Sequence, residues 1–396
     1  MREDADQIKF CNGVKIGVDI RCLLGGKRTG VEEYTLNLLK NLFEVDKKNN
    51  YVLFLNSFTA PKINLEQFKK YSNVEIKIFR FPNKLLNFLF WYLRWPKIDK
   101  MIGGVDVFFM PNINFGAFSQ DTKLILTIHD LSFEYYPETF SLKRRLWHSF
   151  INPHRLCQRS DKIIAVSDST KSDLVASYGI SPQKIEVVSS GISERFEEIT
   201  KNDSKLIEVK EEYKLPYKFI LYLGTIEPRK NITGLIRAYN QLRKIKNSEL
   251  DKYKLVIAGA RGWKYEKIFQ EITTSPYQDD IMMTGFICDN DKSYVYNLAS
   301  LFVYPSFFEG FGFPPLEAIK CGVPTITSNT SSLPEVVGNG GLMIDPDKPD
   351  ELYKAMQGVL LNKDLQGKLK EKGLNYSKKF NWRKSAGEFL ITLKGL

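Results

Sequence analysis

Short apolar runs with the composition of β-strands alternate with helical patterns along the chain, and the alternation occurs twice. Several runs are continuously apolar, as expected for strands that helices cover on both faces. In the first half the runs are Val14–Asp19, Tyr51–Asn56, Val74–Phe79, Asp106–Met110, Leu124–His129 and Lys162–Ser167. In the second half they are Phe219–Gly224, Leu255–Gly259, Ile281–Gly285, Leu301–Pro305, Pro324–Thr327 and Gly341–Ile344. The pattern predicts an α/β protein with two doubly wound parallel sheets.

Helical spacing fills several of the intervals between these runs. The predicted helices are Glu32–Phe43, Ile232–Lys244, Pro314–Lys320 and Pro349–Leu361. A chain of 396 residues is too long for a single hydrophobic core, so two domains are expected. The polar stretch Gly191–Leu215, which follows a predicted strand over Lys184–Ser189, is the expected junction. We therefore predict domains over residues 1–190 and 191–379, with a ligand in a cleft between them at the carboxyl ends of the strands.

Charge and cysteine content narrow the class of partner. The formal charge of +11 favours anionic partners, which include nucleic acid, lipid head groups and phosphorylated small molecules. Because no nucleic-acid-binding signature occurs, nucleic acid is the weakest of the three. Five scattered cysteines without a CxxC pair argue against a disulfide framework or zinc site and favour a reducing compartment. The polar start of the chain does not resemble a secretory signal, so a cytoplasmic protein is expected.

Adjacent cations lie in the turn after the predicted strand Phe219–Gly224, just before a predicted helix. Arg229 can bind phosphate oxygens in a bidentate manner, and Lys230 adds a compact charge. At a strand end that faces a cleft, this pair could neutralise a diphosphate leaving group without a metal ion. The alternative is a solvated basic turn, and the pattern alone leaves both interpretations open.

A glycine-containing loop with two carboxylates follows the predicted strand Leu301–Pro305. Gly310 and Gly312 allow the backbone to approach a ligand closely, and the next helix would point its positive end at an anion. Glu309 in the loop and Glu317 in the helix could each accept a hydrogen bond from a sugar hydroxyl. The alternative is that Glu317 only complements the helix dipole while Glu309 is exposed.

Two further features lie at strand ends in the first half. His129 ends a predicted strand, where a parallel sheet presents catalytic groups, although a lone histidine is more often structural. Gly25-Gly26 follows the first strand and forms a plausible close-approach loop. Because it lacks the full G-x-G-x-x-G fingerprint, a dinucleotide-dependent dehydrogenase is disfavoured.

Taken together, these residues resemble the retaining GT-B glycosyltransferases of family four, and the resemblance covers most of the chain. The motifs that carry it are the Gly-Gly loop, His129-Asp130, Ala165-Val166-Ser167, the Gly-Thr-x-Glu-Pro-Arg-Lys-Asn stretch at 224–231, Glu309-x7-Glu317 and Leu333-Pro334-Glu335-Val336-Val337. The resemblance implies two facing Rossmann-like domains with an interdomain cleft. It also implies that a final helix over residues 380–396 crosses back to the first domain.

The resemblance implies a role for each site residue. Arg229 and Lys230 would bind the donor diphosphate, while Glu317 would hold the ribose. Glu309 would contact the transferred sugar, and His129 would lie near the reacting carbon. The other implied donor contacts are Gly26, Phe286 and Ile287 beside the nucleobase, and the backbone of Phe311, Gly312 and Phe313. No Asp-x-Asp motif occupies an equivalent place, so we expect an enzyme that needs neither a metal nor a cofactor.

The implied reaction is transfer of a hexose with retention at the anomeric carbon. The stretch around residues 226–231 weakly favours mannose, with GDP-mannose as donor. The acceptor would be lipid-linked or an oligosaccharide in the assembly of cell-surface polysaccharide. The alternatives are a nucleotide-sugar hydrolase or epimerase of the same fold and a non-catalytic glycosyltransferase-like subunit.

An aromatic segment, Lys84–Trp95, is flanked by basic residues and is too short to span a bilayer. It could lie at a membrane interface or line a groove for a lipid acceptor, whereas the alternative is an ordinary core helix. Lys143-Arg144-Arg145 forms a second cationic patch, although such a run is usually a solvated face. We expect peripheral contact with an anionic membrane, on the inner face of the plasma membrane.

Overall fold

The computed structural model describes residues 13–25, 29–61 and 63–396, which form two compact units. Unit 1 contains the described residues up to Leu131 together with Lys143–Gly191 and Asn381–Leu396. Unit 2 contains Ser132–Leu142 and Ile192–Phe380. The final segment of the chain therefore packs with the first half, and a short segment of the first half packs with the second.

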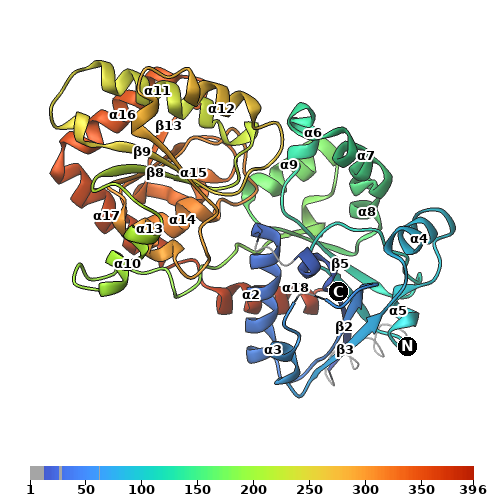
Figure 1. The fold of residues 1–396 in the computed structure, drawn as a ribbon. Coiled ribbons are helices and arrows are strands. Elements are labelled where there is room, and N and C mark those ends of the chain that lie inside the picture. The colour runs from blue at the N-terminus through green and yellow to red at the C-terminus, as the bar shows by residue number, and fades with distance from the viewer. Residues whose placement is uncertain (1–12, 26–28, 62) are drawn as a thin grey trace. The chain divides into compact units, whose positions relative to one another are not determined.

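Unit 1 is built on a seven-stranded parallel sheet with the order β3-β2-β1-β4-β5-β6-β7 (Figure 1). Its strands are β1 (Lys15–Asp19), β2 (Asn50–Asn56), β3 (Val74–Phe79), β4 (Val107–Met110), β5 (Lys123–Ile128), β6 (Lys162–Ala165) and β7 (Ile185–Val187). The strand order reverses direction between β1 and β4, so a topological switch point lies between these two strands.

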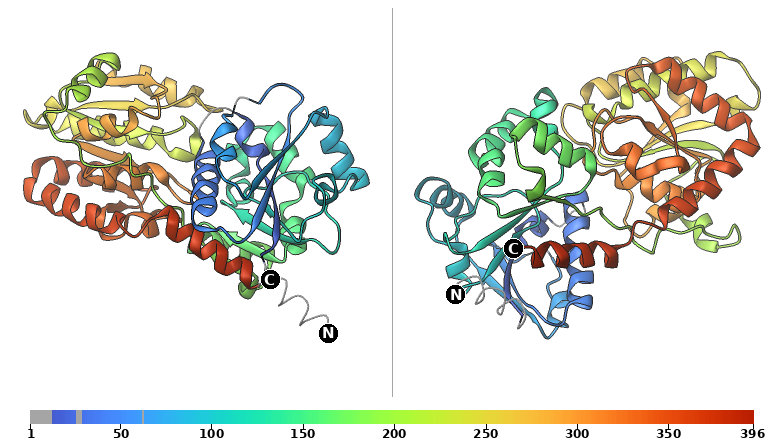
Figure 2. Two further views of the ribbon diagram at one scale, coloured as in Figure 1. Left: turned by 90° about the horizontal axis from the view of Figure 1, so that it is seen from below. Right: turned by 180° about the vertical axis from the view of Figure 1, so that it is seen from behind.

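The helices of unit 1 follow the strands and end with a helix from the extreme C-terminus. They are η1 (Arg21–Gly25), α2 (Gly30–Val45), α3 (Glu66–Lys69), α4 (Asn83–Phe88), the π-helix η2 (Leu89–Leu93), α5 (Ile98–Met101), α7 (Leu142–Ile151), α8 (Pro153–Arg159), α9 (Asp168–Tyr178), η4 (Pro182–Lys184) and α18 (Trp382–Lys394). Helix α18 lies beside α2 (Figures 1 and 2). Phe389 of α18 packs on Phe109 of β4, with ring centroids 4.6 Å apart.

Unit 2 repeats the same architecture around a six-stranded parallel sheet. The order is β10-β9-β8-β11-β12-β13, which is the Rossmann order 3-2-1-4-5-6 when numbered within the unit. The strands are β8 (Phe219–Leu223), β9 (Lys254–Ala258), β10 (Ile281–Gly285), β11 (Leu301–Tyr304), β12 (Thr325–Ser328) and β13 (Leu342–Ile344). The switch point of this sheet lies between β8 and β11.

Helices cover both faces of this second sheet (Figure 1). They are α6 (Ser132–Tyr135), η3 (Pro137–Thr139), α10 (Ser204–Glu212), η5 (Pro228–Lys230), α11 (Ile232–Lys244), η6 (Leu250–Lys252), α12 (Glu266–Thr273), η7 (Gln278–Asp280), α13 (Lys292–Leu298), α14 (Phe313–Lys320), α15 (Leu333–Val337), η8 (Gly338–Gly340), α16 (Pro349–Leu361) and α17 (Lys363–Ser377). Across the described residues, no helix is both long enough and apolar enough to cross a bilayer.

The two parallel, Rossmann-like sheets confirm the predicted fold class. One helix, α10, lies inside the polar stretch that we interpreted as a junction. It begins after Asp203, whose carboxylate accepts a hydrogen bond from the Lys205 amide, and it buries Leu206 and Val209. Two apolar residues three positions apart, surrounded by charged ones, are too weak a pattern to predict a helix from the sequence.

Candidate functional site

The loops at the switch point of unit 2 contain most of the predicted site residues. Strands β8 and β11 are hydrogen-bonded neighbours. The loop after β8 leads into η5, which contains Arg229 and Lys230, and the loop after β11 contains Glu309. Since ligands of doubly wound sheets bind at the carboxyl ends of the strands flanking the switch point, this edge is the natural place for a binding site.

Arg229, Lys230 and Glu309 form one ionic cluster, in which Lys230 and Glu309 are buried and Arg229 is half-buried. Lys230 Nζ lies 2.5 Å from Glu309 Oε1, and an Arg229 guanidinium nitrogen lies 3.2 Å from Glu309 Oε2. The same guanidinium contacts Glu227 at 2.9 Å. With Glu227 included, two cations face two carboxylates, so the cluster has no net formal charge. The alternative of a solvated basic turn is therefore wrong for this pair, and Glu309 is not exposed.

Neighbouring groups fix the two cations in place. Lys230 donates a second hydrogen bond, of 2.9 Å, to the hydroxyl of Tyr304 at the end of β11. The Tyr304 ring stacks on Tyr222 of β8, with centroids 5.6 Å apart and planes at 8°. Arg229 donates to the carbonyl oxygen of Phe308. The two loops are thus tied to each other by hydrogen bonds as well as by charge.

The cluster shifts the proton affinities of its members. Burial alone would raise the pKa of Glu309, but the charges of Arg229 and Lys230 outweigh it and lower that pKa to about 2. The pKa of Lys230 is lowered, first by burial and then by repulsion from Arg229, against the attraction of Glu309. Glu309 is therefore a carboxylate of low basicity at neutral pH.

The loop between Glu309 and α14 is shaped by a glycine and supported by serines. Gly312 has φ of +108°, which L side chains rarely adopt, and a Cβ there would lie 2.9 Å from Leu333. Ser331 accepts a hydrogen bond of 2.9 Å from the Glu309 amide. Ser332 donates to the carbonyl oxygens of Glu309 and Phe311 at 2.9 and 2.7 Å.

The start of α14 offers fewer hydrogen-bond donors than an ordinary helix. Pro314 and Pro315 occupy its first turn and have no N–H. The Leu316 amide already donates to the Gly312 carbonyl oxygen. The predicted backbone cradle for phosphate therefore depends on the amides of Phe311, Gly312 and Phe313.

Glu317 lies one turn into α14 and is buried. Its carboxylate accepts a hydrogen bond of 2.8 Å from the hydroxyl of Tyr296 on α13. Burial, followed by the charge of Glu317, raises the pKa of Tyr296 well above its usual value, so this phenol stays a donor. The hydrogen bond orients the Glu317 carboxylate. Glu317 therefore has a specific partner and does more than complement the helix dipole.

His129 belongs to unit 1, directly after β5. Its Nε2 lies 2.8 Å from the carbonyl oxygen of Pro111, and the ring meets Tyr34 edge-on at 4.8 Å. Burial lowers the pKa of His129 despite this hydrogen bond and the nearby Asp130. A neutral ring that donates Nε2–H to Pro111 keeps Nδ1 as a hydrogen-bond acceptor.

The remaining predicted donor-binding residues differ in their exposure to solvent. Phe286 is exposed after β10, whereas the adjacent Ile287 is buried. Phe311 is buried and packs against Phe313 with centroids 5.2 Å apart. Gly26 lies outside the described residues. Within the described part of the chain, no group of three or more His, Cys, Asp or Glu side chains could hold a metal ion.

The sequence-based prediction missed several residues that organise the site. These are Glu227, Tyr296, Tyr304, Ser331 and Ser332. Glu227 lies inside the motif at 224–231 and could have been predicted as a partner of Arg229. Nothing in the sequence signalled the other four, because their partners come from distant segments.

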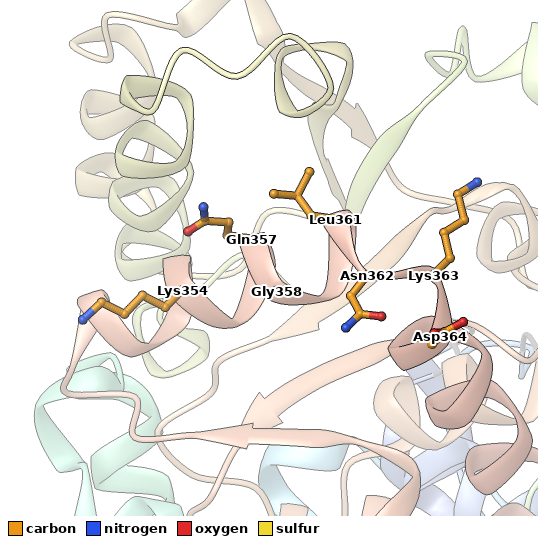
Figure 3. Close-up of a pocket in the computed structure, with 7 residues that line it drawn as sticks. All are labelled: Lys354, Gln357, Gly358, Leu361, Asn362, Lys363 and Asp364. Atoms are coloured by element: carbon orange, nitrogen blue, oxygen red, sulfur yellow. The ribbon is translucent and has the colours of Figure 1, made fainter.

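A surface hollow of about 510 Å³ lies beside the junction of α16 and α17 (Figure 3). Its lining residues are Lys354, Gln357, Gly358, Leu361, Asn362, Lys363 and Asp364. The hollow is open to solvent and contains none of the predicted site residues among those described.

Known structures with the same fold define the structural class. HepE of Anabaena, solved with UDP and glucose, aligns with a TM-score of 0.70 over 97% of this chain and 100% of its own, at 17% identity. With two Rossmann-like units and this strand order, the chain is a GT-B protein.

Sequence comparisons then identify the family. The model for glycosyl transferases group 1 matches residues 203–376, and that for glycosyltransferase family 4 matches residues 28–196. O-antigen chain mannosyltransferase B of Escherichia coli is 34% identical over 261 residues, which cover 66% of this chain and 67% of that relative. Serotype-specific mannosyltransferase WbdA of Escherichia coli is also 34% identical, but the chain spans only 32% of its length. The chain belongs to the group 1 glycosyl transferases.

Proposed function

We propose that this glycosyltransferase moves a mannosyl group from GDP-mannose to a lipid-linked or oligosaccharide acceptor, with retention at the anomeric carbon. The observation that carries the proposal is the ionic cluster of Arg229, Lys230 and Glu309 at the switch point of unit 2. Both relatives are named as mannosyltransferases, which supports mannose as the sugar, and the one named as an O-antigen chain enzyme supports a cell-surface polysaccharide as the product.

In the proposed reaction, the bond between the anomeric carbon and the diphosphate oxygen breaks as a bond to the acceptor oxygen forms. The proton of the acceptor hydroxyl passes to the departing phosphate oxygen. Arg229 and Lys230 stabilise the charge that develops on the diphosphate, in a buried site where such interactions are strong. Glu309 holds both cations and accepts a hydrogen bond from a hydroxyl of the sugar.

The low basicity of Glu309 supports attack from the same face as the leaving group. A retaining glycosidase uses one carboxylate as a nucleophile. Glu309 is engaged by two cations, and its pKa is lowered to about 2, so it is a weak nucleophile. We therefore assign Glu309 to sugar binding and cation positioning.

The remaining donor contacts are assigned by position. We assign Glu317, which Tyr296 orients, to the ribose hydroxyls, and the exposed Phe286 to the nucleobase, as the family resemblance implies. We assign His129 a contact with the sugar near the reacting carbon, as the family resemblance implies; Gly26, to which the resemblance gives a diphosphate contact, lies outside the described residues. Neither a divalent ion nor a cofactor is required in this proposal. We place the enzyme in the cytoplasm, in peripheral contact with the inner face of the plasma membrane.

Donor binding and donor turnover test separate parts of this proposal. Thermal unfolding with GDP, UDP and their sugars should show the largest rise in Tm with GDP-mannose, because a ligand that binds the folded state stabilises it. NMR of the product should show the anomeric configuration of the donor retained. Free mannose from donor alone at the rate of transfer would instead identify a hydrolase, and stabilisation by UDP-sugars alone would contradict the assignment of GDP-mannose.

A further inference from the structure

Six large apolar side chains of α4, η2 and the residues just after η2 are exposed to solvent. They are Leu85, Phe88, Trp91, Tyr92, Leu93 and Trp95. Tyr92 is 67% exposed and Trp95 is 62% exposed, far more than side chains of a core helix. The interpretation of this segment as an ordinary core helix is therefore wrong, because only Leu86 and Phe90 of α4 and η2 are buried.

Helix α7 adds a second exposed apolar face. Leu142, Leu146 and Phe150 recur every four residues, so they share one side of the helix. All three are exposed, Leu142 by 70%, and none of the ten described residues of α7 is buried. The helix is therefore amphipathic, and its apolar face is largely open to solvent.

The two segments meet and form one surface. The ring of Trp91 on η2 contacts Phe150 on α7, with centroids 5.2 Å apart. Phe88 and Tyr92 stack beside this contact at 5.7 Å. We call the joint surface of α4, η2, Trp95 and α7 the aromatic face.

One buried ring, that of Phe90, connects the aromatic face to the end of β1. The buried ring of Phe90 packs under the guanidinium of Arg21, whose carbon lies 5.7 Å from the ring centroid. Arg21 is itself fixed by a buried ion pair of 2.6 Å with Asp19 at the end of β1. The exposed rings are therefore presented by an ordered helix.

Both segments are free of acidic residues and rich in basic ones. The stretch between Glu75 and Asp99 contains five Lys or Arg and no Asp or Glu. The stretch from Phe140 to Ser160 also contains five Lys or Arg and no Asp or Glu. Lys77 and Arg159 pair with the flanking Glu75 and Asp161, so eight of these ten positive charges count toward binding an anionic partner.

We propose that the aromatic face docks onto an anionic lipid bilayer, with its Trp, Tyr, Phe and Leu side chains in the interfacial region. Trp and Tyr prefer the boundary between head groups and acyl chains. Basic residues beside an apolar helix face bind anionic head groups, and α7 has this composition. The charge complementarity favours a bilayer over a protein partner. The role of this docking rests on the proposed function, because an enzyme docked on the bilayer is placed to reach a lipid-linked acceptor.

Co-sedimentation with vesicles of phosphatidylglycerol and phosphatidylcholine tests the aromatic face. The full chain should bind these vesicles, lose at least fivefold in bound fraction when phosphatidylglycerol is omitted, and lose binding as salt is raised. The double variant Tyr92→Ser/Trp95→Ser should reduce binding at least fivefold without unfolding, because both side chains are exposed. Its matched control is Tyr217→Ser, an 85% exposed tyrosine of unit 2 that lies beside Lys210.

Charge reversal tests the basic component independently. Lys143→Glu/Arg144→Glu/Arg145→Glu should abolish binding to anionic vesicles. Reversal of three exposed lysines of α17 makes the same change in net charge and should leave most binding intact; these are Lys363, Lys368 and Lys372. Equal losses from the two reversals, or wild-type binding by the aromatic variant, would overturn the proposal.

The outcome can be separated from that of the proposed function. If the wild type fails to bind anionic vesicles yet transfers mannose to a soluble oligosaccharide, the aromatic face is not a membrane surface. Self-association that the Tyr92→Ser/Trp95→Ser variant abolishes, without vesicle binding, would assign the face to a protein interface instead. Vesicle binding without any transfer would contradict the proposed function alone.

Discussion

Lys230 Nζ lies 2.5 Å from Glu309 Oε1, and this ion pair joins the loops that follow β8 and β11. The two partners are 79 positions apart in the sequence, and three of the six strands of unit 2, β9, β10 and β11, lie between them. The pair therefore exists only after the sheet has formed. It fixes a cation at the switch point while leaving the cluster electrically neutral, so an arriving diphosphate introduces the net negative charge.

Replacing either cation of the cluster should stop transfer. In Arg229→Ala and Lys230→Ala we expect kcat/KM to fall by at least about 100-fold, because charge on the leaving diphosphate loses its stabilisation. Steady-state kinetics with GDP-mannose and circular dichroism check this together. Arg237→Ala is the matched control, since Arg237 forms an exposed pair with Glu271 and should keep wild-type turnover. Wild-type activity in Lys230→Ala would remove Lys230 from the leaving-group role.

Tyr304 should act as a positioning residue for Lys230. In Tyr304→Phe, Lys230 loses a hydrogen bond to its charged form, so its already lowered pKa should fall further. We expect kcat to drop about tenfold, on the scale of one lost hydrogen bond to a charged group, and the alkaline limb of the pH–rate profile to move to lower pH. Tyr239→Phe removes another buried hydroxyl, which donates to the Tyr253 carbonyl oxygen, and should leave that limb in place. An unmoved limb in Tyr304→Phe would mean that its hydroxyl is only structural.

Because of Glu309, the free energy of unfolding of unit 2 should fall as the pH is lowered. Its pKa in the folded protein is about 2, against an ordinary value of 4.5, so its contribution is complete above pH 4.5 and is lost as pH falls towards 2. The loss is on the order of 3 kcal/mol over that interval. Urea unfolding between pH 5 and pH 3 should show the free energy falling more steeply for the wild type than for Glu309→Gln. Parallel pH dependences for the two proteins would contradict the assigned ion pairs.

The sequence was sufficient to predict the repeated sheets, because buried parallel strands are continuously apolar and parallel pairing requires helices between them. It also indicated which strand ends matter, since Arg229 and Glu309 follow β8 and β11. Pairing between the two could not be predicted, because it depends on strand order and not on proximity in the chain. The resemblance assigned Arg229 and Lys230 to phosphate binding. It did not indicate that both cations form ion pairs with Glu309, or that Arg229 also pairs with Glu227.

Exposure was the least predictable property. For residues 84–95 the sequence left a membrane surface and a core helix both open, with the membrane surface favoured, and the structure buries only Leu86 and Phe90 of α4 and η2. The apolar residues of α7 were not recognised in the sequence, because the interpretation rested on the three basic residues at 143–145. The sequence assigned Tyr304 only to a strand, because the hydrogen-bond partner of its hydroxyl, Lys230, lies 74 residues earlier.

Removal of divalent ions should leave transfer intact. The proposed stabilisation of the diphosphate comes from Arg229 and Lys230, so 5–10 mM EDTA, used as a rough working range, should change kcat/KM by less than about twofold, a barrier change well below 1 kcal/mol. Dialysis followed by assay with and without added Mg²⁺ or Mn²⁺ provides the comparison. Recovery of activity only after addition of metal would show that a divalent ion shares the role given to the two cations.

The C-terminal helix should stabilise unit 1 and leave donor binding by unit 2 unchanged. Phe389 of α18 is fully buried against Phe109 of β4, so Phe389→Ala should cost about 3–5 kcal/mol through lost burial and a cavity. Ile391, two residues further along α18, is exposed, and Ile391→Ala should change stability by no more than about 0.5 kcal/mol. Urea unfolding with and without GDP separates the units, since GDP should protect chiefly the transition of unit 2, which contains Arg229, Lys230 and Glu317. If Phe389→Ala lowers the transition that GDP protects, α18 supports the donor-binding unit instead.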